Sequence, residues 1–146
     1  MARTFLVIDA NEADAARTAG MLRSIEPAAA VLLAGDGSAA LALLEEQRVV
    51  PALTFLDFGG HPMNAMEFLS QIRSRRWLER APVAMLSSVV ADREVVTCYR
   101  LGAAAFLTKP VRVHELRETL RDFALPAGQA AVSRIFDRHG TFRTAA

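Results

Sequence analysis

Four polar residues of this chain have the side-chain types that phosphoryl chemistry requires, and each stands where a short apolar run ends. They are Asp9, Asp57, Ser87 and Lys109. Two carboxylates can hold a hard divalent cation, and one of them can attack phosphorus as a nucleophile. A hydroxyl and an ammonium group can bind the oxygens of the transferred group. If the four run ends meet in one crevice, the pattern indicates phosphoryl transfer to Asp57.

The elements that must position these residues are visible as apolar runs of strand length. The runs are continuous rather than alternating, which is typical of strands covered on both faces and therefore of a parallel sheet between helices. They occupy residues 5–8, 30–33, 53–56, 83–86 and 105–107.

Segments with apolar residues three and four apart separate these runs and predict helices. The clearest covers about residues 113–123, where Leu116 and Leu120 lie on one face. Asp36 is suited to open a helix and Gly102 to close one. The alternation predicts an α/β fold, (βα)5, with a doubly wound five-stranded parallel sheet in the flavodoxin-like order 2-1-3-4-5. Ligands of such sheets bind beyond the carboxyl ends of the strands, where the four polar residues stand.

Length and charge exclude several classes of partner. The chain has 146 residues, which suits one domain, and a formal net charge of +1. A near-neutral balance gives no reason to expect a nucleic-acid footprint, so we expect no DNA partner. No apolar run approaches the roughly 18 residues that span a bilayer, and the apolar start is too short for a signal peptide. We therefore expect no membrane partner and a cytoplasmic location.

Five segments, taken in order along the chain, resemble the motifs of one family. They are residues 7–9, 53–57, 63–67, 82–87 and 102–110. Each segment alone is a weak signal, whereas all of them in order are a specific one. The chain is similar to the receiver domain of bacterial two-component systems, the response-regulator family that includes chemotaxis regulators. We assign residues 1–124 to this domain and residues 125–146 to a C-terminal tail.

The resemblance implies a phosphorylation site with a metal ion beside it. It implies that Asp57 is the phospho-acceptor, and that Asp9, Asp57 and the backbone carbonyl of Gly59 hold Mg²⁺. Receivers usually have two acidic residues at the end of the first strand, and here Ala10 follows Asp9. We expect the loss of one carboxylate to weaken Mg²⁺ binding. Glu12 offers compensation through a water, although an acid in the first turn of a helix is already favoured by the helix dipole.

The resemblance also implies a switch and an output surface. Lys109 would pair with the phosphoryl oxygens, and Ser87 would hydrogen-bond them after phosphorylation. The movement of Ser87 would vacate space for Phe106, the implied aromatic rotamer switch, which on residue type alone is an ordinary core aromatic. The output surface would be the fourth helix, the fifth strand and the fifth helix. The implied partners are a sensor histidine kinase and a downstream protein target.

The tail opens on a helix-breaking segment, residues 125–128, and is too short for a helix-turn-helix output domain. Its apolar residues Ile135, Phe136 and Phe142 lie among arginines, a pattern that suits a short amphipathic helix. We expect this helix to pack on the fifth helix of its own or of a second protomer, and the second arrangement would give a homodimer. A frayed terminus is the alternative.

Three functions compete for this sequence. A single-domain response regulator, which signals through protein contacts after Asp57 is phosphorylated, accounts best for Asp57, Ser87 and Lys109 together. A pseudo-receiver, which keeps the fold as an interaction module without phosphorylation, is motivated by Ala10. A hydrolase of the aspartyl-phosphate kind would want an acid two residues after the nucleophile, where Gly59 stands. We expect no enzymatic activity beyond the chain's part in its own phosphoryl transfer and dephosphorylation.

Overall fold

A central sheet with the strand order β2-β1-β3-β4-β5-β6-β7 organises the chain. The computed structural model describes residues 2–58, 62–88, 92–123, 134–136 and 142–144. Neighbouring strands from β2 to β5 run parallel, so the predicted five-stranded parallel sheet with the order 2-1-3-4-5 is confirmed. These strands are β1 (Thr4–Ile8), β2 (Ala30–Ala34), β3 (Leu53–Asp57), β4 (Val83–Ser87) and β5 (Ala105–Thr108).

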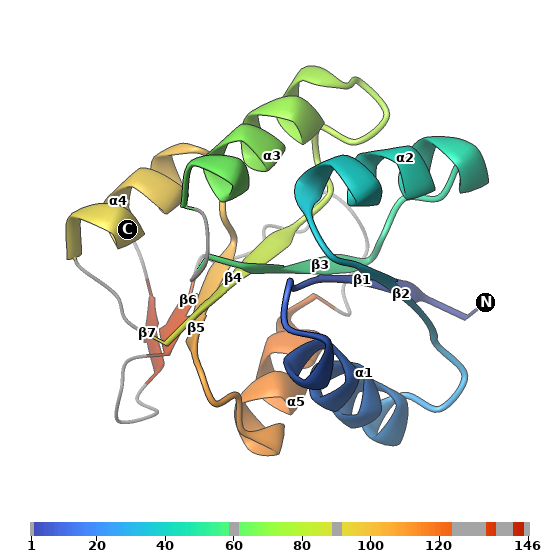
Figure 1. Ribbon diagram of the computed structural model, residues 1–146. Helices are drawn as coiled ribbons and strands as arrows, with labels where there is room; N and C mark the ends of the chain where they lie inside the picture. Colours follow the sequence, from blue (N-terminus) through green and yellow to red (C-terminus); the bar gives the residue numbers. More distant parts are fainter. Residues whose placement is uncertain (1, 59–61, 89–91, 124–133, 137–141, 145–146) are drawn as a thin grey trace.

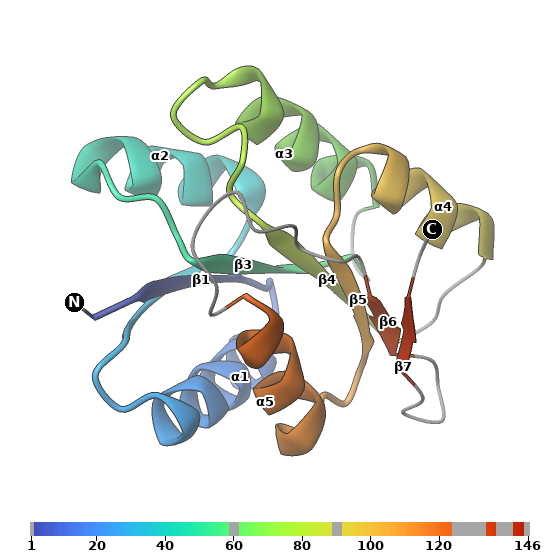
Figure 2. The ribbon, with the colours of Figure 1, turned by 180° about the vertical axis from the view of Figure 1, so that it is seen from behind.

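Five helices cover the two faces of this sheet, as Figures 1 and 2 show from opposite sides. Helices α1 and α5 lie on one face, and α2, α3 and α4 lie on the other. Each helix lies between two consecutive strands of the chain, as the predicted βα alternation requires. The helices are α1 (Glu12–Ile25), α2 (Gly37–Gln47), α3 (Pro62–Ser74), α4 (Asp92–Arg100) and α5 (Val113–Asp122).

The alternation of side chains along each strand divides the core into two layers. Phe5 and Val7 of β1 belong to the layer that includes Leu22 of α1 and Leu116 of α5. Leu6 and Ile8 point the opposite way, into the layer that includes residues of α2, α3 and α4. Burying one such side chain contributes about 1.5–3 kcal/mol. Both faces of the sheet are therefore held by apolar packing, which is why its strands read as continuous apolar runs.

The tail adds two strands where an amphipathic helix was expected. Strand β6 (Arg134–Phe136) pairs with β5 in parallel, and β7 (Phe142–Thr144) pairs with β6 in antiparallel fashion. The helix prediction is wrong for these six positions, because the edge of β5 offers unpaired backbone N–H and C=O groups and Ile and Phe favour strands. The rest of the tail lies outside the described residues. No helix in the described part of the chain is long and apolar enough to cross a membrane.

An arginine of α3 and a glycine after α4 join α3 to the segments that precede β4 and β5, at the end of the sheet opposite the predicted site. Gly102, which was predicted to end a helix, follows α4 with φ of 94°, in the left-handed region. The Arg73 guanidinium of α3 donates hydrogen bonds to the carbonyls of Gly102, at 2.8 Å, and Ala81, at 2.7 Å. A Cβ at position 102 would lie 2.7 Å from Nε of Arg73. The left-handed backbone therefore favours glycine here, and a Cβ would also displace the Arg73 guanidinium.

We predict that Gly102→Ala lowers the free energy of unfolding by about 1–2 kcal/mol, because the left-handed conformation strains any residue with a Cβ. The loss is measured as a lower urea midpoint. Gly20→Ala is the matched control, since Gly20 lies within α1 and nothing lies within 4 Å of the added Cβ. That variant should keep or raise the midpoint, by up to about 1 kcal/mol. Equal midpoints for the two variants would contradict the role given to Gly102.

Candidate functional site

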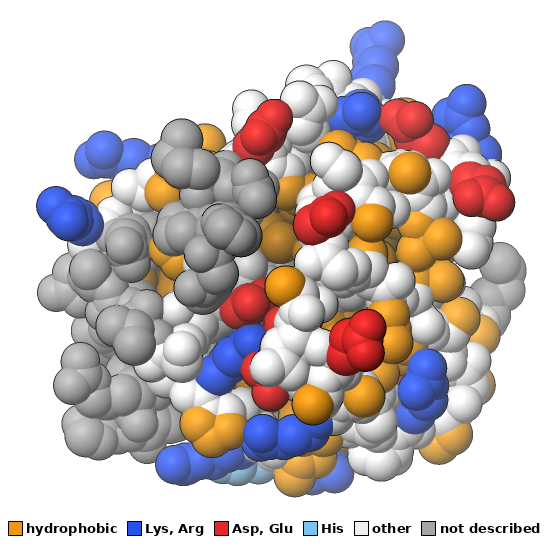
Figure 3. Space-filling view, in the orientation of Figure 1, with side chains coloured by type: hydrophobic (Ala, Val, Ile, Leu, Met, Phe, Trp, Pro, Cys, Tyr) orange, Lys and Arg blue, Asp and Glu red, His pale blue; other side chains and the backbone are white. Residues whose placement is uncertain are grey.

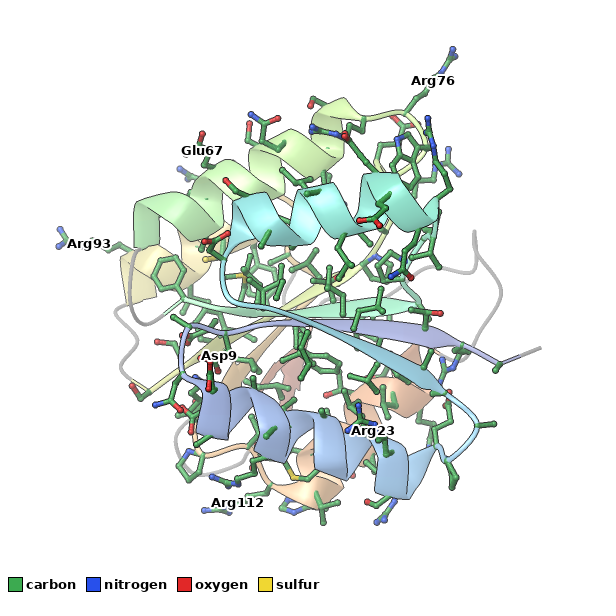
Figure 4. The ribbon with its side chains drawn as sticks, turned by 45° about the vertical axis from the view of Figure 1, so that its right-hand side comes forward. Asp9, Arg23, Glu67, Arg76, Arg93 and Arg112 are labelled. Carbon is green, nitrogen blue, oxygen red and sulfur yellow. The ribbon has the colours of Figure 1, made fainter. Side chains whose placement is uncertain are left out.

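Three of the four predicted polar residues meet at the carboxyl end of the sheet. Asp57 is the last residue of β3, Asp9 follows β1, and Lys109 follows β5. Figure 4 places Asp9 at this end of the sheet, next to the start of α1. Parallel strands end at one edge, so residues far apart in the sequence come together there. The predicted crevice is therefore present.

The ammonium group of Lys109 is the centre of this site. Its Nζ lies 2.8 Å from Oδ2 of Asp9, 3.1 Å from Oδ1 of Asp57 and 3.3 Å from Oδ2 of Asp14. The Lys109 side chain is only 16% exposed. One largely buried cation thus contacts three carboxylates, and burial makes charge interactions stronger than in bulk water.

The balance of forces on Lys109 keeps it charged. Burial alone lowers the pKa of this ammonium group, but hydrogen bonds to Asp9 and Asp57, together with their negative charges, outweigh the burial. The pKa of Lys109 is therefore raised above its ordinary value. Lys109 is consequently a permanent cation at neutral pH, aimed at the Asp57 carboxylate.

Asp9 is held on both of its oxygens. Its side chain has no exposed surface. Oδ1 accepts the backbone N–H of Asn11 at 2.9 Å, and Oδ2 accepts Lys109. The same Asn11 caps α1, because its side-chain oxygen accepts the N–H of Asp14 at 3.0 Å. Asp9 therefore fixes the start of α1 relative to the sheet and holds Lys109 in place.

A pocket of about 400 Å³ opens beside these contacts. Figure 3 shows acidic and basic side chains side by side on this part of the surface, to the left of its centre. Asp57 forms part of the wall, and its side chain is 15% exposed. The wall consists of Asn11, Asp14, Arg17, Thr18, Met21, Asp57, Ser88, Lys109, Pro110 and Val111.

The remaining predicted site residues occupy different surroundings. Ser87 ends β4 and is only 1% exposed. The described wall of the pocket includes the next residue, Ser88, but not Ser87. Phe106 is 1% exposed in the core layer beneath α3 and α4. The backbone N–H of Lys109 donates to the Ser87 carbonyl at 2.8 Å, which ties β4 to β5 at the site. Gly59, the predicted carbonyl ligand, lies outside the described residues.

Asp14 is the site residue that sequence reasoning missed. It stands in the first turn of α1 rather than at a strand end, so the pattern that identified the other four residues did not include it. Glu12, the acid that the sequence offered as compensation for Ala10, is exposed and does not appear in the described wall of the pocket. The sequence did offer one signal for Asp14. The predicted helix after Asp9 must start near the ends of the neighbouring strands, so an acid in its first turn lies close to the site.

The carboxylates on the pocket wall suit a hard cation. Mg²⁺ commonly takes one or two protein carboxylates and completes its shell with water and phosphate oxygens. Asp57 and Asp14 both line the pocket and meet this requirement. Within the described ranges, no group of three or more His, Cys, Asp or Glu side chains forms a complete metal site by itself. Water and substrate oxygens would have to supply most of the ligands.

Comparison with known proteins agrees with this geometry. The family model of the response regulator receiver domain matches residues 5–121. The two-component response regulator ORR11 of Oryza sativa is 32% identical over 107 residues, which cover 73% of this chain and 71% of that protein. The sensory/regulatory protein RpfC of Xanthomonas campestris is 37% identical over 71 residues, or 47% of this chain. The matched part spans only 10% of RpfC, a much longer protein.

The fold has counterparts among solved structures. The Mn²⁺-bound form of response regulator Rcp1 superposes with a TM-score of 0.62 at 23% identity, covering 82% of this chain and 89% of that one. At this identity the likeness concerns the fold alone. The family match covers most of the chain and includes every strand and helix that carries the acidic pocket and Lys109. The chain therefore belongs to the response regulator receiver domain family.

Proposed function

We propose that this chain is a single-domain response regulator that accepts a phosphoryl group on Asp57 from a sensor histidine kinase. The observation that carries the proposal is the contact of 3.1 Å between the Lys109 ammonium and a pocket-lining Asp57 carboxylate. A carboxylate that only ended a strand would not need a buried cation and an open pocket beside it. The chain takes part in its own phosphoryl transfer and dephosphorylation and has no other enzymatic role.

The transfer is a displacement at phosphorus. An oxygen of Asp57 forms the new O–P bond while the N–P bond of the kinase phosphohistidine breaks, and the released imidazole nitrogen regains a proton from solvent. The Lys109 ammonium then forms an ion pair with the phosphoryl oxygens in place of part of its contact with Asp57, because the phosphoryl group carries about −1.5 to −2 charge. Asp9 keeps Lys109 oriented throughout.

Mg²⁺ is the cofactor that this proposal requires. The proposed ligands are Asp57, Asp9 and the Gly59 carbonyl, and the Mn²⁺-bound structure of the similar protein Rcp1 supports a divalent cation in this fold. When bound, the ion would neutralise charge on the phosphoryl oxygens and on the attacking carboxylate. Ala10 stands where the family has a second acid, so we propose that the affinity for Mg²⁺ is reduced.

The signal would leave the site through Ser87 and Phe106. Phosphorylation adds strong acceptors next to the end of β4, which draws the Ser87 hydroxyl toward Asp57. The space left by Ser87 would let Phe106 of β5 take a more inward rotamer. This rearrangement alters the surface of α4, β5 and α5, where a downstream protein target would bind. We also propose a cytoplasmic location, because the proposed partner is a histidine kinase. The near-neutral net charge gives no support for a DNA partner.

The pseudo-receiver remains the second candidate, and Ala10 is the observation that favours it. In that case the fold would serve as an interaction module, and Lys109 would be only a structural neutraliser of Asp9 and Asp57. The two functions differ in whether Asp57 reacts, so a direct measurement of the phosphoryl adduct separates them.

The intact mass of the protein after incubation with a small phosphoryl donor tests the proposal. With Mg²⁺ present, we predict one added phosphoryl group on the wild-type chain and none on Asp57→Asn, which has no nucleophilic carboxylate at this position. Omission of Mg²⁺ should lower the yield. Wild-type protein that gains no phosphoryl group at any Mg²⁺ concentration would favour the pseudo-receiver.

Restoring the missing acid should strengthen the cation site. We predict that Ala10→Asp lowers the Mg²⁺ concentration needed for half-maximal adduct formation by about tenfold, because an added carboxylate next to the site increases affinity for a hard cation. Ala10 is exposed, so the change should fold normally. Ala10→Asn is the control of the same size without the charge. The same half-maximal concentration in wild type and Ala10→Asp would show that position 10 does not limit Mg²⁺.

We also propose that the chain forms a homodimer through α5 and the tail. The described tail residues form β6 and β7 beside β5, and β7 ends the sheet, so its outer edge can pair with a second copy. Light scattering should give the mass of a dimer for the full chain and that of a monomer for a chain that stops after Ala124. An unchanged state of association after the truncation would remove the dimer proposal.

A further inference from the structure

Asp14, one of two acids in the first turn of α1, stands at a helix-capping position but does not make the usual capping hydrogen bond. Asp14 stands three residues after the cap residue Asn11, where an acid ordinarily accepts the backbone N–H of the cap residue. Here that N–H is already donated to Oδ1 of Asp9 at 2.9 Å. Helix capping therefore does not account for the direction of the Asp14 carboxylate, which contacts Lys109 across the pocket at 3.3 Å.

Receivers usually have two acids at the end of the first strand, and this chain has Ala10 in place of the second. The first acid, Asp9, already accepts hydrogen bonds within the protein. Asp9 has no exposed side-chain surface, and both of its oxygens accept hydrogen bonds. Asp9 is not among the described residues that line the pocket, so a cation inside the pocket would meet other carboxylates first. The carboxylates that line the pocket are those of Asp57 and Asp14.

Asp14 has the accessibility that Asp9 lacks. Its side chain is 43% exposed, and one of its oxygens lies within 3.3 Å of the same nitrogen that Asp57 contacts at 3.1 Å. The two carboxylates therefore share one neighbour, and both line the pocket, one on α1 and one on β3.

We infer that Asp14 supplies the second carboxylate of the divalent cation site, in place of the acid that the chain lacks at position 10. The inference rests on the proposed function, because it concerns the same pocket. Three carboxylates surround the ammonium of Lys109, and Arg17 adds a second positive charge to the pocket wall, so these groups together keep a net negative charge that a divalent cation offsets. The second carboxylate of the site thus comes from the first turn of α1, whereas receivers usually take it from the residue after the first acid at the end of the first strand.

The binding of Mn²⁺, a paramagnetic substitute for Mg²⁺, tests this assignment without any phosphoryl donor. Free Mn²⁺ is measured by electron paramagnetic resonance in titrations of the full-length chain. The test variant is Asp14→Asn, which keeps the size of the side chain and the backbone N–H that Asn11 caps. The control is Glu12→Gln, which removes the same charge from the same helical turn but from an exposed residue outside the described pocket wall.

We predict that Asp14→Asn raises the Kd for Mn²⁺ about tenfold or more, as loss of a ligand or its support does in other sites, and that Glu12→Gln changes it less than twofold. Adding Ala10→Asp to the Asp14→Asn chain should restore most of the affinity, which also demonstrates that the variant is folded. Equal Kd values for the two single variants would overturn the inference.

The outcomes separate this inference from the proposed function. Wild-type chain that binds no Mn²⁺ overturns the inference, whereas Mn²⁺ binding that depends on Asp14 supports it. If binding depends on Asp14 but Asp57 gains no phosphoryl group, the inference stands and the proposed function fails.

Discussion

The contact of one buried ammonium with several carboxylates is the constraint on which the site depends. Lys109 and Asp9 are 100 residues apart in the chain and meet at 2.8 Å. Removing one partner of a buried ion pair typically costs about 3–5 kcal/mol, because the other charge is left unpaired. The sheet must therefore bring the ends of β1, β3 and β5 together with accuracy, and the two apolar layers on its faces hold them there.

The same contact joins the chemistry to the rest of the fold. Lys109 is tied through its backbone to the Ser87 carbonyl, and Asp9 is tied through Asn11 to the start of α1. A change of charge at Asp57 alters the force on Lys109 first, and Lys109 lies three residues after Phe106 on the β5 side of the sheet. We propose that the response of the surface formed by α4, β5 and α5 begins with a redistribution of contacts around Lys109.

Much of the fold and part of the site were predictable from the sequence. Continuous apolar runs such as residues 53–56 identify strands buried on both faces, and polar residues at their ends identify the crevice. Asp14 was not predictable in this way, because its position depends on where α1 starts relative to the strand ends. The strands of the tail were also missed, since Ile135 and Phe136 suit a helix or a strand and only the open edge of β5 decides between them.

We propose that the acidic cluster around Lys109 binds a divalent cation through Asp57. Thermal unfolding of the wild-type chain, with Mg²⁺ titrated at constant ionic strength, measures this binding without a phosphoryl donor. A ligand at one hundred times its Kd stabilises the folded state by about 2.7 kcal/mol. We expect a saturable rise in Tm of several degrees for the wild type and a much smaller rise for Asp57→Asn. The absence of any rise, or an equal rise in both chains, would contradict it.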